Sequence, residues 1–368
     1  MNNPAPTSPD RASRILVRGV NWLGDAVMTT PALLRLREHF PNAHITHFCP
    51  EKINALWRHH PAIDETMTFE SGEGLFSIGR KLRAGRFDLA LVLPNSPRSA
   101  MEAFLARIPQ RIGYARPWRN FFLTWTITSR AGAVKMHKRT EAEIKALIAN
   151  PPSARAPYPA AAHQMHEYLH LVAALGANPE PLAPKLVVTP EEVEAAKKKF
   201  GLEALMRPIF GLNPGAEYGP AKRWPAEKFS AAAKEIQSHT NCLWLIFGGK
   251  NDATIADQIG KKINHQNLAG KTSLRELMAL LKLCRVLLTN DTGPMHVAAA
   301  LGTPVVVPFG STSPELTGPV PADGLQHQII QSDAPCSPCF LRECPIDFRC
   351  LNGISSAQVA ATVLQAVR

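Results

Sequence analysis

The sequence predicts an α/β protein made of two successive domains, each with a parallel sheet covered by helices. Its 368 residues exceed one domain of roughly 100 to 200 residues. Short apolar runs typical of buried strands alternate with stretches of helical spacing. The alternation stops in a Pro-rich stretch at 176–190 and then restarts. We therefore expect a disordered start over residues 1–13, a first domain over 14–180 and a second over 181–368.

The elements follow from the same periodicity. In the first domain we expect strands at 14–20, 45–49 and 89–93, and helices at 26–40, 53–60, 76–83 and 164–175. In the second we expect strands at 209–212, 242–247, 285–289 and 305–308, helices at 226–237, 253–263, 274–283 and 294–300, and a closing helix at 356–368. Alternating strands and helices favour parallel sheets covered on both faces.

Composition excludes several classes of protein. Lys and Arg total 41 against 30 Asp and Glu, and residues 1–180 hold 22 against 14, a net charge of +8 that favours an anionic partner. Seven cysteines in a chain of this length do not make a disulfide scaffold, and residues 1–13 lack the apolar segment of a signal peptide. No run reaches the roughly 20 apolar residues of a membrane span. We expect a cytoplasmic protein, soluble or peripheral to a membrane.

Three loops follow strands at the edge where parallel sheets bind ligands. The first, residues 19–25 (GVNWLGD), has two glycines at the spacing of a phosphate loop, but Asp25 stands where such a loop has Lys. It also lacks the glycine pattern of a dinucleotide site. Asp25 is therefore either a helix cap or a general base.

The second loop, residues 213–225 (NPGAEYGPAKRWP), combines two glycines with Lys222 and Arg223. It is either an anion-binding loop or a solvated basic turn.

The third loop, residues 290–296 (NDTGPMH), begins a helix. Asp291 or Thr292 can cap that helix, and Gly293 lets a ligand approach the backbone. His296 is either a donor to a bound diphosphate or a structural hydrogen-bonding residue. The chain has no D-x-D sequence that would hold Mg²⁺ on a nucleotide diphosphate, so we expect no metal and no cofactor in this site.

Two further segments stand out. Residues 111–125 (RIGYARPWRNFFLTW) place five aromatic side chains among three arginines, which predicts an interfacial or sugar-stacking loop unless Phe121, Phe122 and Trp125 are core residues. The second segment is a Cys-rich tail at 333–350, in which Cys336, Cys339, Cys344 and Cys350 are spaced C-x₂-C-x₄-C-x₅-C. They are compatible with a structural zinc site, with reduced packing thiols or with a disulfide.

The three loops in this order resemble the ADP-heptose:lipopolysaccharide heptosyltransferases, a family of inverting glycosyltransferases. The resemblance is tightest over ILVRGVNWLGDAVMTTPAL (15–33) and TNDTGPMHVAAALGTPVVVPFGSTSPELTGP (289–319), and CSPCFLRECP (336–345) is similar to heptosyltransferase II members. It implies the GT-B architecture, in which two Rossmann-like domains face a cleft. It also implies an acceptor-binding first domain and a donor-binding second domain.

The resemblance implies roles for single residues. Asp25 matches the proposed catalytic base, Lys222 a lysine on the donor diphosphate, and Asp291, Thr292, Gly293 and His296 the donor-phosphate segment. Thr272 matches a position near the adenine and Asp252 a position near the ribose. Trp22, with Asn21 before it, stands where many relatives have small or polar residues. Asn21, Trp22, Arg116 and Arg119 are the candidate acceptor contacts.

The resemblance further implies ADP-heptose as donor and the phosphorylated, Kdo-containing inner core on lipid A as acceptor, at the cytoplasmic face of the inner membrane. No nucleic-acid partner is expected. Transfer of the second heptose, onto heptosyl-Kdo-lipid A, is the first hypothesis, and heptosyltransferase I or another user of ADP-heptose is the second. A nucleotide-sugar epimerase of the same fold and a non-catalytic nucleotide-binding module are the more distant alternatives.

Overall fold

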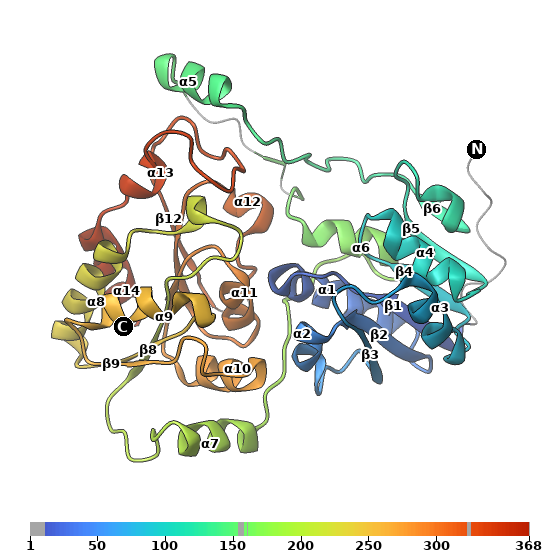
Figure 1. The fold of residues 1–368 in the computed structure, drawn as a ribbon, viewed down its shortest axis with the longest axis horizontal. Helices are drawn as coiled ribbons and strands as arrows, with labels where there is room; N and C mark the ends of the chain where they lie inside the picture. The colour runs from blue at the N-terminus through green and yellow to red at the C-terminus, as the bar shows by residue number, and fades with distance from the viewer. Residues whose placement is uncertain (1–11, 154–157, 160, 322–324, 368) are drawn as a thin grey trace. The chain divides into compact units, whose positions relative to one another are not determined.

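A computed structural model describes residues 12–153, 158–159, 161–321 and 325–367. The chain forms two compact units, one of residues 1–133 and 161–187 and the other of residues 134–160 and 188–368 (Figure 1). In the described part of each unit one six-stranded parallel sheet is covered by helices. The predicted α/β class is confirmed.

The sheet of unit 1 has the strand order β3-β2-β1-β4-β5-β6, and each neighbouring pair is parallel. Its strands are β1 (Arg14–Arg18), β2 (His44–Pro50), β3 (Glu65–Phe69), β4 (Leu89–Val92), β5 (Gln110–Tyr114) and β6 (Trp125–Ile127). The central strands are buried almost throughout, as expected for a sheet with both faces covered.

Helices connect these strands. They are α1 (Leu23–His39), α2 (Glu51–Asn54), η2 (Ala55–Trp57), α3 (Leu75–Ala84), α4 (Pro97–Leu105), η3 (Asn120–Phe122) and α6 (Met165–Ala173). Ser96 caps α4 by accepting a hydrogen bond from the Ser99 N–H, and Pro97 takes the first helical position, where its missing N–H costs nothing. The periodicity predicted α1, α3 and α6, whereas β3, β5, β6 and α4 were missed.

The sheet of unit 2 has the order β12-β11-β10-β7-β8-β9, again parallel throughout. Its strands are β7 (Ile209–Asn213), β8 (Leu243–Ile246), β9 (His265–Asn267), β10 (Leu287–Thr289), β11 (Val305–Phe309) and β12 (Gln328–Gln331). Its helices are α5 (Glu141–Ala149), α7 (Pro190–Lys199), η4 (Pro220–Lys222), α8 (Ala226–Thr240), η5 (Lys250–Asp252), α9 (Ala253–Gly260), α10 (Leu274–Leu283), α11 (Gly293–Ala300), α12 (Pro314–Thr317), α13 (Arg349–Asn352) and α14 (Ser356–Ala366). The closing helix α14 packs against α8.

The predicted domain boundary at residues 180 and 181 needs correction. The chain leaves unit 1 after Ala133, contributes residues 134–160 to unit 2, and returns to unit 1 for α6. Ile144 of α5 is buried in the core of unit 2. The Arg139 guanidinium donates to the Cys336 carbonyl at 2.8 Å, and its N–H to the Cys339 carbonyl at 3.0 Å. These contacts, made about 200 residues along the chain, are not visible in local periodicity.

The predicted disordered start is also corrected in part. Residues 1–11 lie outside the described residues, but Ser13 donates hydrogen bonds from its N–H and its hydroxyl to the Asp88 carboxylate, at 2.9 and 2.8 Å. The corrected domain boundaries also change the charge balance between the two units. Unit 1 holds 18 Lys and Arg against 12 Asp and Glu, and unit 2 holds 23 against 18. The net charges of the units are thus +6 and +5, so the +8 counted over residues 1–180 does not distinguish unit 1 from unit 2.

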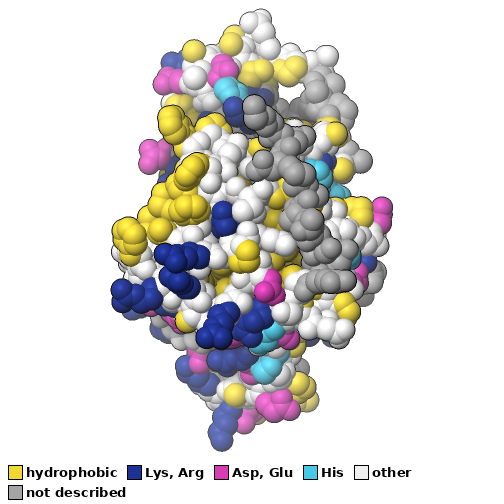
Figure 2. Space-filling model, turned by 90° about the vertical axis from the view of Figure 1, so that its right-hand side faces the viewer, with side chains coloured by type: hydrophobic (Ala, Val, Ile, Leu, Met, Phe, Trp, Pro, Cys, Tyr) yellow, Lys and Arg dark blue, Asp and Glu magenta, His cyan; other side chains and the backbone are white. Residues whose placement is uncertain are grey.

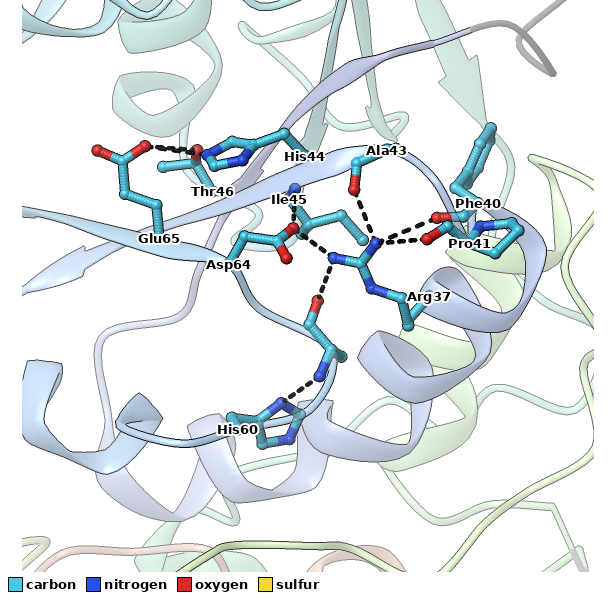
Figure 3. A network of polar contacts seen from close by, with 11 residues as sticks. Arg37, Phe40, Pro41, Ala43, His44, Ile45, Thr46, His60, Asp64 and Glu65 are labelled. Atoms are coloured by element: carbon cyan, nitrogen blue, oxygen red, sulfur yellow. Dashed lines mark hydrogen bonds and ion pairs between the residues drawn. The ribbon is translucent and has the colours of Figure 1, made fainter.

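A polar network joins α1 to β2 and β3 (Figure 3). The Arg37 guanidinium donates to the carbonyls of Phe40, Pro41 and Ala43 just beyond the end of α1, and pairs with the Asp64 carboxylate. That carboxylate accepts the Ile45 N–H at 2.7 Å. Partial burial opposes ionisation of Asp64, but these two donors lower its pKa. The network fixes the amino ends of β2 and β3 and leaves the carboxyl edge of the sheet to the loops described next.

Within the described residues, no helix is both long enough and apolar enough to cross a bilayer.

Candidate active site

Both sheets have a topological switch point beside their first strand. In unit 1, β1 lies between β2 and β4, and in unit 2, β7 lies between β8 and β10. The chain winds outward in opposite directions from these strands, so the loops at their carboxyl ends diverge, which is where open α/β sheets bind ligands. The predicted loops 19–25, 213–225 and 290–296 leave β1, β7 and β10 at these two switch points.

Asp25 is the third residue of α1, after the N-cap Trp22. Asp25 is therefore not the N-cap residue itself, because Trp22 occupies that position and provides no side-chain cap. A carboxylate in the first turn is stabilised by the positive end of the helix dipole. The phenol of Tyr168 on α6 is close by. Burial raises the pKa of Tyr168, and the negative charge of Asp25 raises it further.

A buried ion pair supports the loop before Asp25. The Nε of Arg18, the last residue of β1, lies 2.7 Å from Glu102 Oε2 on α4, and both side chains are buried. The same guanidinium donates to the Gly19 carbonyl and, at 3.1 Å, to Asn21 Oδ1. Asn21 is thus held by Arg18. Its neighbour Trp22 is half exposed, with Lys52 Nζ 5.2 Å from the centroid of its ring.

Arg119 is fully buried near the same switch point. Its Nη1 donates to Asn95 Oδ1 at 3.1 Å, just beyond the end of β4, whereas Nε and Nη2 have no hydrogen-bond partner among the described residues. Burial, followed by the charge of Arg116, lowers the pKa of Arg119 to about 10. A buried guanidinium with unused donors is costly unless an anion binds it. Arg116 instead donates to the Ala115 carbonyl and to Ser129 Oγ, both at 2.9 Å.

In unit 2, two asparagines tie the switch-point loops together. Asn290, directly after β10, donates to the Pro214 carbonyl at 2.7 Å and accepts the Trp224 N–H at 3.0 Å. Asn213, the last residue of β7, donates weakly to the Thr292 hydroxyl at 3.5 Å. Much of the 213–225 loop is buried, so it is not a solvated turn.

Two of the predicted donor-binding residues contact each other. Lys222 Nζ lies 2.6 Å from Asp291 Oδ2, which also accepts the Thr312 hydroxyl at 2.5 Å. Lys222 also lies 4.9 Å from the ring centroid of Tyr218. At Gly219, φ is +149°, and a Cβ there would lie 2.5 Å from the Arg342 carbonyl oxygen. This close approach requires glycine.

Helix α11 begins at Gly293, with Thr292 as its N-cap. The Thr292 hydroxyl makes no capping hydrogen bond, and His296 is buried in the first turn. The first turn of a helix carries N–H groups without intrahelical partners, and these favour an anion. The structure thus brings Lys222, Asp291 and this helix start to one edge of unit 2.

Asp252 adjoins this group from the next loop. A Cβ on Gly215 would lie 2.4 Å from Asp252 Oδ2, and Arg223 Nη2 lies 3.9 Å from Asp252 Oδ1. Thr272 is farther along the same edge, directly before Ser273, which caps α10. The Gly270 N–H joins that loop to the Gly248 carbonyl at 2.9 Å.

The four clustered cysteines line a small cavity together with Ile144 and Ser311. All are free thiols, and no group of three His, Cys, Asp or Glu side chains in the described part of the chain is arranged to hold a metal ion. Burial raises the pKa of Cys336 and Cys339, and raises that of Cys350 to about 12. Cys336, Cys339 and Cys350 pack in the core of unit 2.

Sequence reasoning missed the residues that support the site. Arg18, Glu102, Asn213, Asn290 and Thr312 carry no predicted role, although both asparagines stand at the ends of apolar strand segments, where a polar side chain faces the ligand edge. No comparable feature of the sequence marked Glu102 as part of the site.

Comparisons with known proteins relate the chain to one family. The profile of glycosyltransferase family 9 (heptosyltransferase) matches residues 75–348. Lipooligosaccharide heptosyltransferase 2 of Haemophilus ducreyi is 33% identical over 337 residues, 86% of this chain and 89% of that protein. Lipopolysaccharide heptosyltransferase 2 of Salmonella typhimurium is 32% identical over 83% of this chain and 85% of its own length. The structure of Escherichia coli ADP-heptose lps heptosyltransferase II superposes with a TM-score of 0.75 at 28% identity, covering 96% of this chain and 98% of that one. With its two parallel sheets, its loops at both switch points and these similarities, the chain belongs to glycosyltransferase family 9, the heptosyltransferases.

Proposed function

We propose that this protein transfers heptose from ADP-heptose to the inner core of lipopolysaccharide, adding the second heptose to heptosyl-Kdo-lipid A. The observation that carries the proposal is the similarity to heptosyltransferase 2 proteins over more than four fifths of the chain. The two switch-point edges add chemistry suited to such a transfer, a carboxylate in unit 1 and an anion-binding helix start in unit 2.

In this proposal Asp25 is the general base. The acceptor hydroxyl attacks the anomeric carbon of the donor from the face opposite ADP, and Asp25 removes the hydroxyl proton as the new bond forms. The helix dipole of α1 favours the ionised carboxylate that this step requires. The Arg18–Glu102 pair acts indirectly, because it holds the loop from Gly19 to Asn21 that precedes the base.

Unit 2 binds the donor. The N–H groups that begin α11, the Lys222 ammonium and His296 stabilise the charge that develops on the departing diphosphate. Asp291 holds Lys222 in place before the donor binds, and Lys222 then shares its donors between Asp291 and the phosphate oxygens. Because these groups supply positive charge themselves, we propose that transfer needs no metal ion; activity that survives EDTA supports this, and activity restored only by Mg²⁺ contradicts it.

The acceptor side is assigned to Arg119. Its unused Nε and Nη2 donors suit a carboxylate or phosphate of the inner core. Since this acceptor is built on a lipid, the protein is proposed to work as a peripheral enzyme at the cytoplasmic face of the inner membrane.

Product analysis tests the proposal. Purified protein is incubated with ADP-heptose and core lipids that carry no heptose or one heptose, and the lipids are analysed by mass spectrometry. One added heptose on the one-heptose acceptor supports second-heptose transfer. Addition only to the heptose-free lipid indicates heptosyltransferase I activity. An altered sugar nucleotide without lipid product indicates an epimerase, and ADP-heptose binding without any product indicates a non-catalytic module.

A further inference from the structure

The positive charge of unit 1 is concentrated in one segment. Residues 75–127 hold nine Lys and Arg against two Asp and Glu, whereas the rest of unit 1 holds nine against ten. Both acidic side chains are already engaged. Glu102 is buried against Arg18, and Asp88 accepts hydrogen bonds from Ser13 and Arg14. Glu102 also lies 3.4 Å from the exposed Arg98, and Glu73, just before the segment, pairs with Lys81 at 3.0 Å. These carboxylates are too few to offset the nine cations.

The same segment carries exposed aromatic side chains. Among the described residues, half of the large exposed hydrophobic side chains belong to it, and all of these are aromatic: Phe76, Phe104, Trp118 and Phe121. Trp118 is 89% exposed and Phe121 80% exposed. Single exposed hydrophobic residues are normal, but aromatic residues gathered among cations indicate an interaction surface.

Three aromatic rings of this segment, those of Phe104, Phe121 and Phe122, form a cluster at the end of α4. The Phe104 ring centroid lies 5.9 Å from that of Phe121 and 5.5 Å from that of Phe122. Phe122 packs against the core, whereas Phe121 faces outward. The Arg111 guanidinium lies 5.4 Å from the Phe104 ring centroid, so a cation is part of the cluster.

Trp118 has an unusual backbone. Its φ of +64° is in the left-handed region, which is unfavourable for a bulky side chain. Since Trp118 is almost fully exposed, packing within unit 1 does not offset this strain. This backbone conformation leaves the Trp118 indole accessible to solvent.

Helix α3 extends the positive surface. It packs against α4, and a Cβ on Gly79 would lie 2.8 Å from Leu105 Cβ. Arg80 and Arg83, one and four residues beyond Gly79, are exposed. Figure 2 views the side on which Figure 1 draws α3, α4 and β6, and there hydrophobic side chains lie next to a group of Lys and Arg side chains.

We propose that Phe76, Phe104, Trp118 and Phe121, with the surrounding arginines, form a face that docks on an anionic lipid bilayer. Aromatic side chains insert at the level of the lipid headgroups, and arginines near the surface attract anionic lipids. The inference rests on the proposed function, because a lipid-linked acceptor makes such a surface useful. Charge complementarity favours a bilayer over a protein partner, since residues 75–127 carry nine Lys and Arg against two Asp and Glu, and Arg111 lies against the aromatic cluster.

Cosedimentation with vesicles tests this face. We expect the wild-type protein to bind phosphatidylglycerol-containing vesicles and to bind phosphatidylcholine vesicles weakly. The double variant Trp118→Ser/Phe121→Ser should bind the anionic vesicles at least about tenfold more weakly, as should Arg80→Gln/Arg83→Gln. A higher salt concentration should weaken only the part of the vesicle binding that the arginines contribute. The matched controls are Met206→Ser, another exposed hydrophobic side chain, and Lys261→Gln/Lys262→Gln, another exposed cationic pair; both should bind like wild type.

Three results would overturn the docking face. They are no wild-type binding to anionic vesicles, equal binding by the face variants, or a wild-type dimer in sedimentation velocity that these variants dissociate. The last would assign the face to a second copy of the chain. A separate assay on a water-soluble acceptor without acyl chains keeps the proposed function distinct. There Trp118→Ser/Phe121→Ser should transfer heptose at the wild-type rate, and absence of transfer by wild type would contradict the function while leaving the vesicle result valid.

Discussion

The buried pair of Arg18 and Glu102 allows a quantitative test of how the loop before Asp25 is supported. In Glu102→Gln the side-chain shape is kept and the charge is removed. The Glu102 side chain is fully buried, with Oε2 2.7 Å from Arg18 Nε. At an effective dielectric constant of about 20, unit charges about 4 Å apart attract by about 4 kcal/mol.

In Glu102→Gln a neutral hydrogen bond replaces part of the attraction between the two charges. The glutamine oxygen still accepts the Arg18 N–H, a bond worth about 1 kcal/mol. Arg18 also keeps the Gly19 carbonyl and lies 4.5 Å from the Phe69 ring centroid. We therefore expect the free energy of unfolding to fall by about 3 kcal/mol, at the lower end of the cost of breaking a buried pair.

Urea unfolding followed by circular dichroism measures the loss. Glu38→Gln is the control, since Glu38 is exposed and pairs with Arg35 at 2.7 Å on the same helix; its cost should stay below about 0.5 kcal/mol. The double variant Arg18→Met/Glu102→Leu should recover most of the stability because no charge remains buried. A loss below about 1 kcal/mol in Glu102→Gln would refute the reasoning.

Further predictions concern the proposed base, the donor site and pH. Asp25→Asn should lower turnover about a hundredfold or more with ADP affinity nearly unchanged, measured by steady-state kinetics and calorimetry; weaker ADP binding at normal turnover would contradict its role as base. Lys222→Ala should weaken ADP binding about tenfold or more by calorimetric titration, whereas the exposed Lys234→Ala should not, and equal affinities would remove Lys222 from the donor site. Burial, and then the Lys185 charge, lowers the pKa of His60 to about 4, so the unfolded state binds a proton more readily. Stability should therefore be fully present above pH 6.5 and fall as the pH drops toward 4. At pH 4.5 the loss should reach about 2 to 3 kcal/mol relative to His60→Gln, and parallel urea midpoints for the two proteins would exclude this effect.

Much of the fold could be predicted from local patterns. The strands that became β1, β2, β4, β7, β8, β10 and β11 are apolar runs, and helices such as α1, α8 and α10 repeat apolar residues at helical spacing. Short or half-exposed elements such as β3 and β9 were missed because none of their residues is fully buried, which leaves a weak apolar signal. The candidate loops were located correctly at strand ends because the carboxyl edge of a parallel sheet follows from chain direction alone.

By itself, the sequence determined the class of fold, the loops that begin α1 and α11, and the clustering of aromatic and basic residues at 111–125. The tertiary structure decided which of those side chains are buried and which are exposed. It buries Arg119 and exposes Trp118 only one residue away, and it returns residues 134–160 to unit 2. It also pairs Lys222 with Asp291 and Arg18 with Glu102. The physical reason is that periodicity reports which face of an element is apolar. Burial, ion pairing and desolvation depend on partners that are distant in the chain and meet only when the sheets assemble.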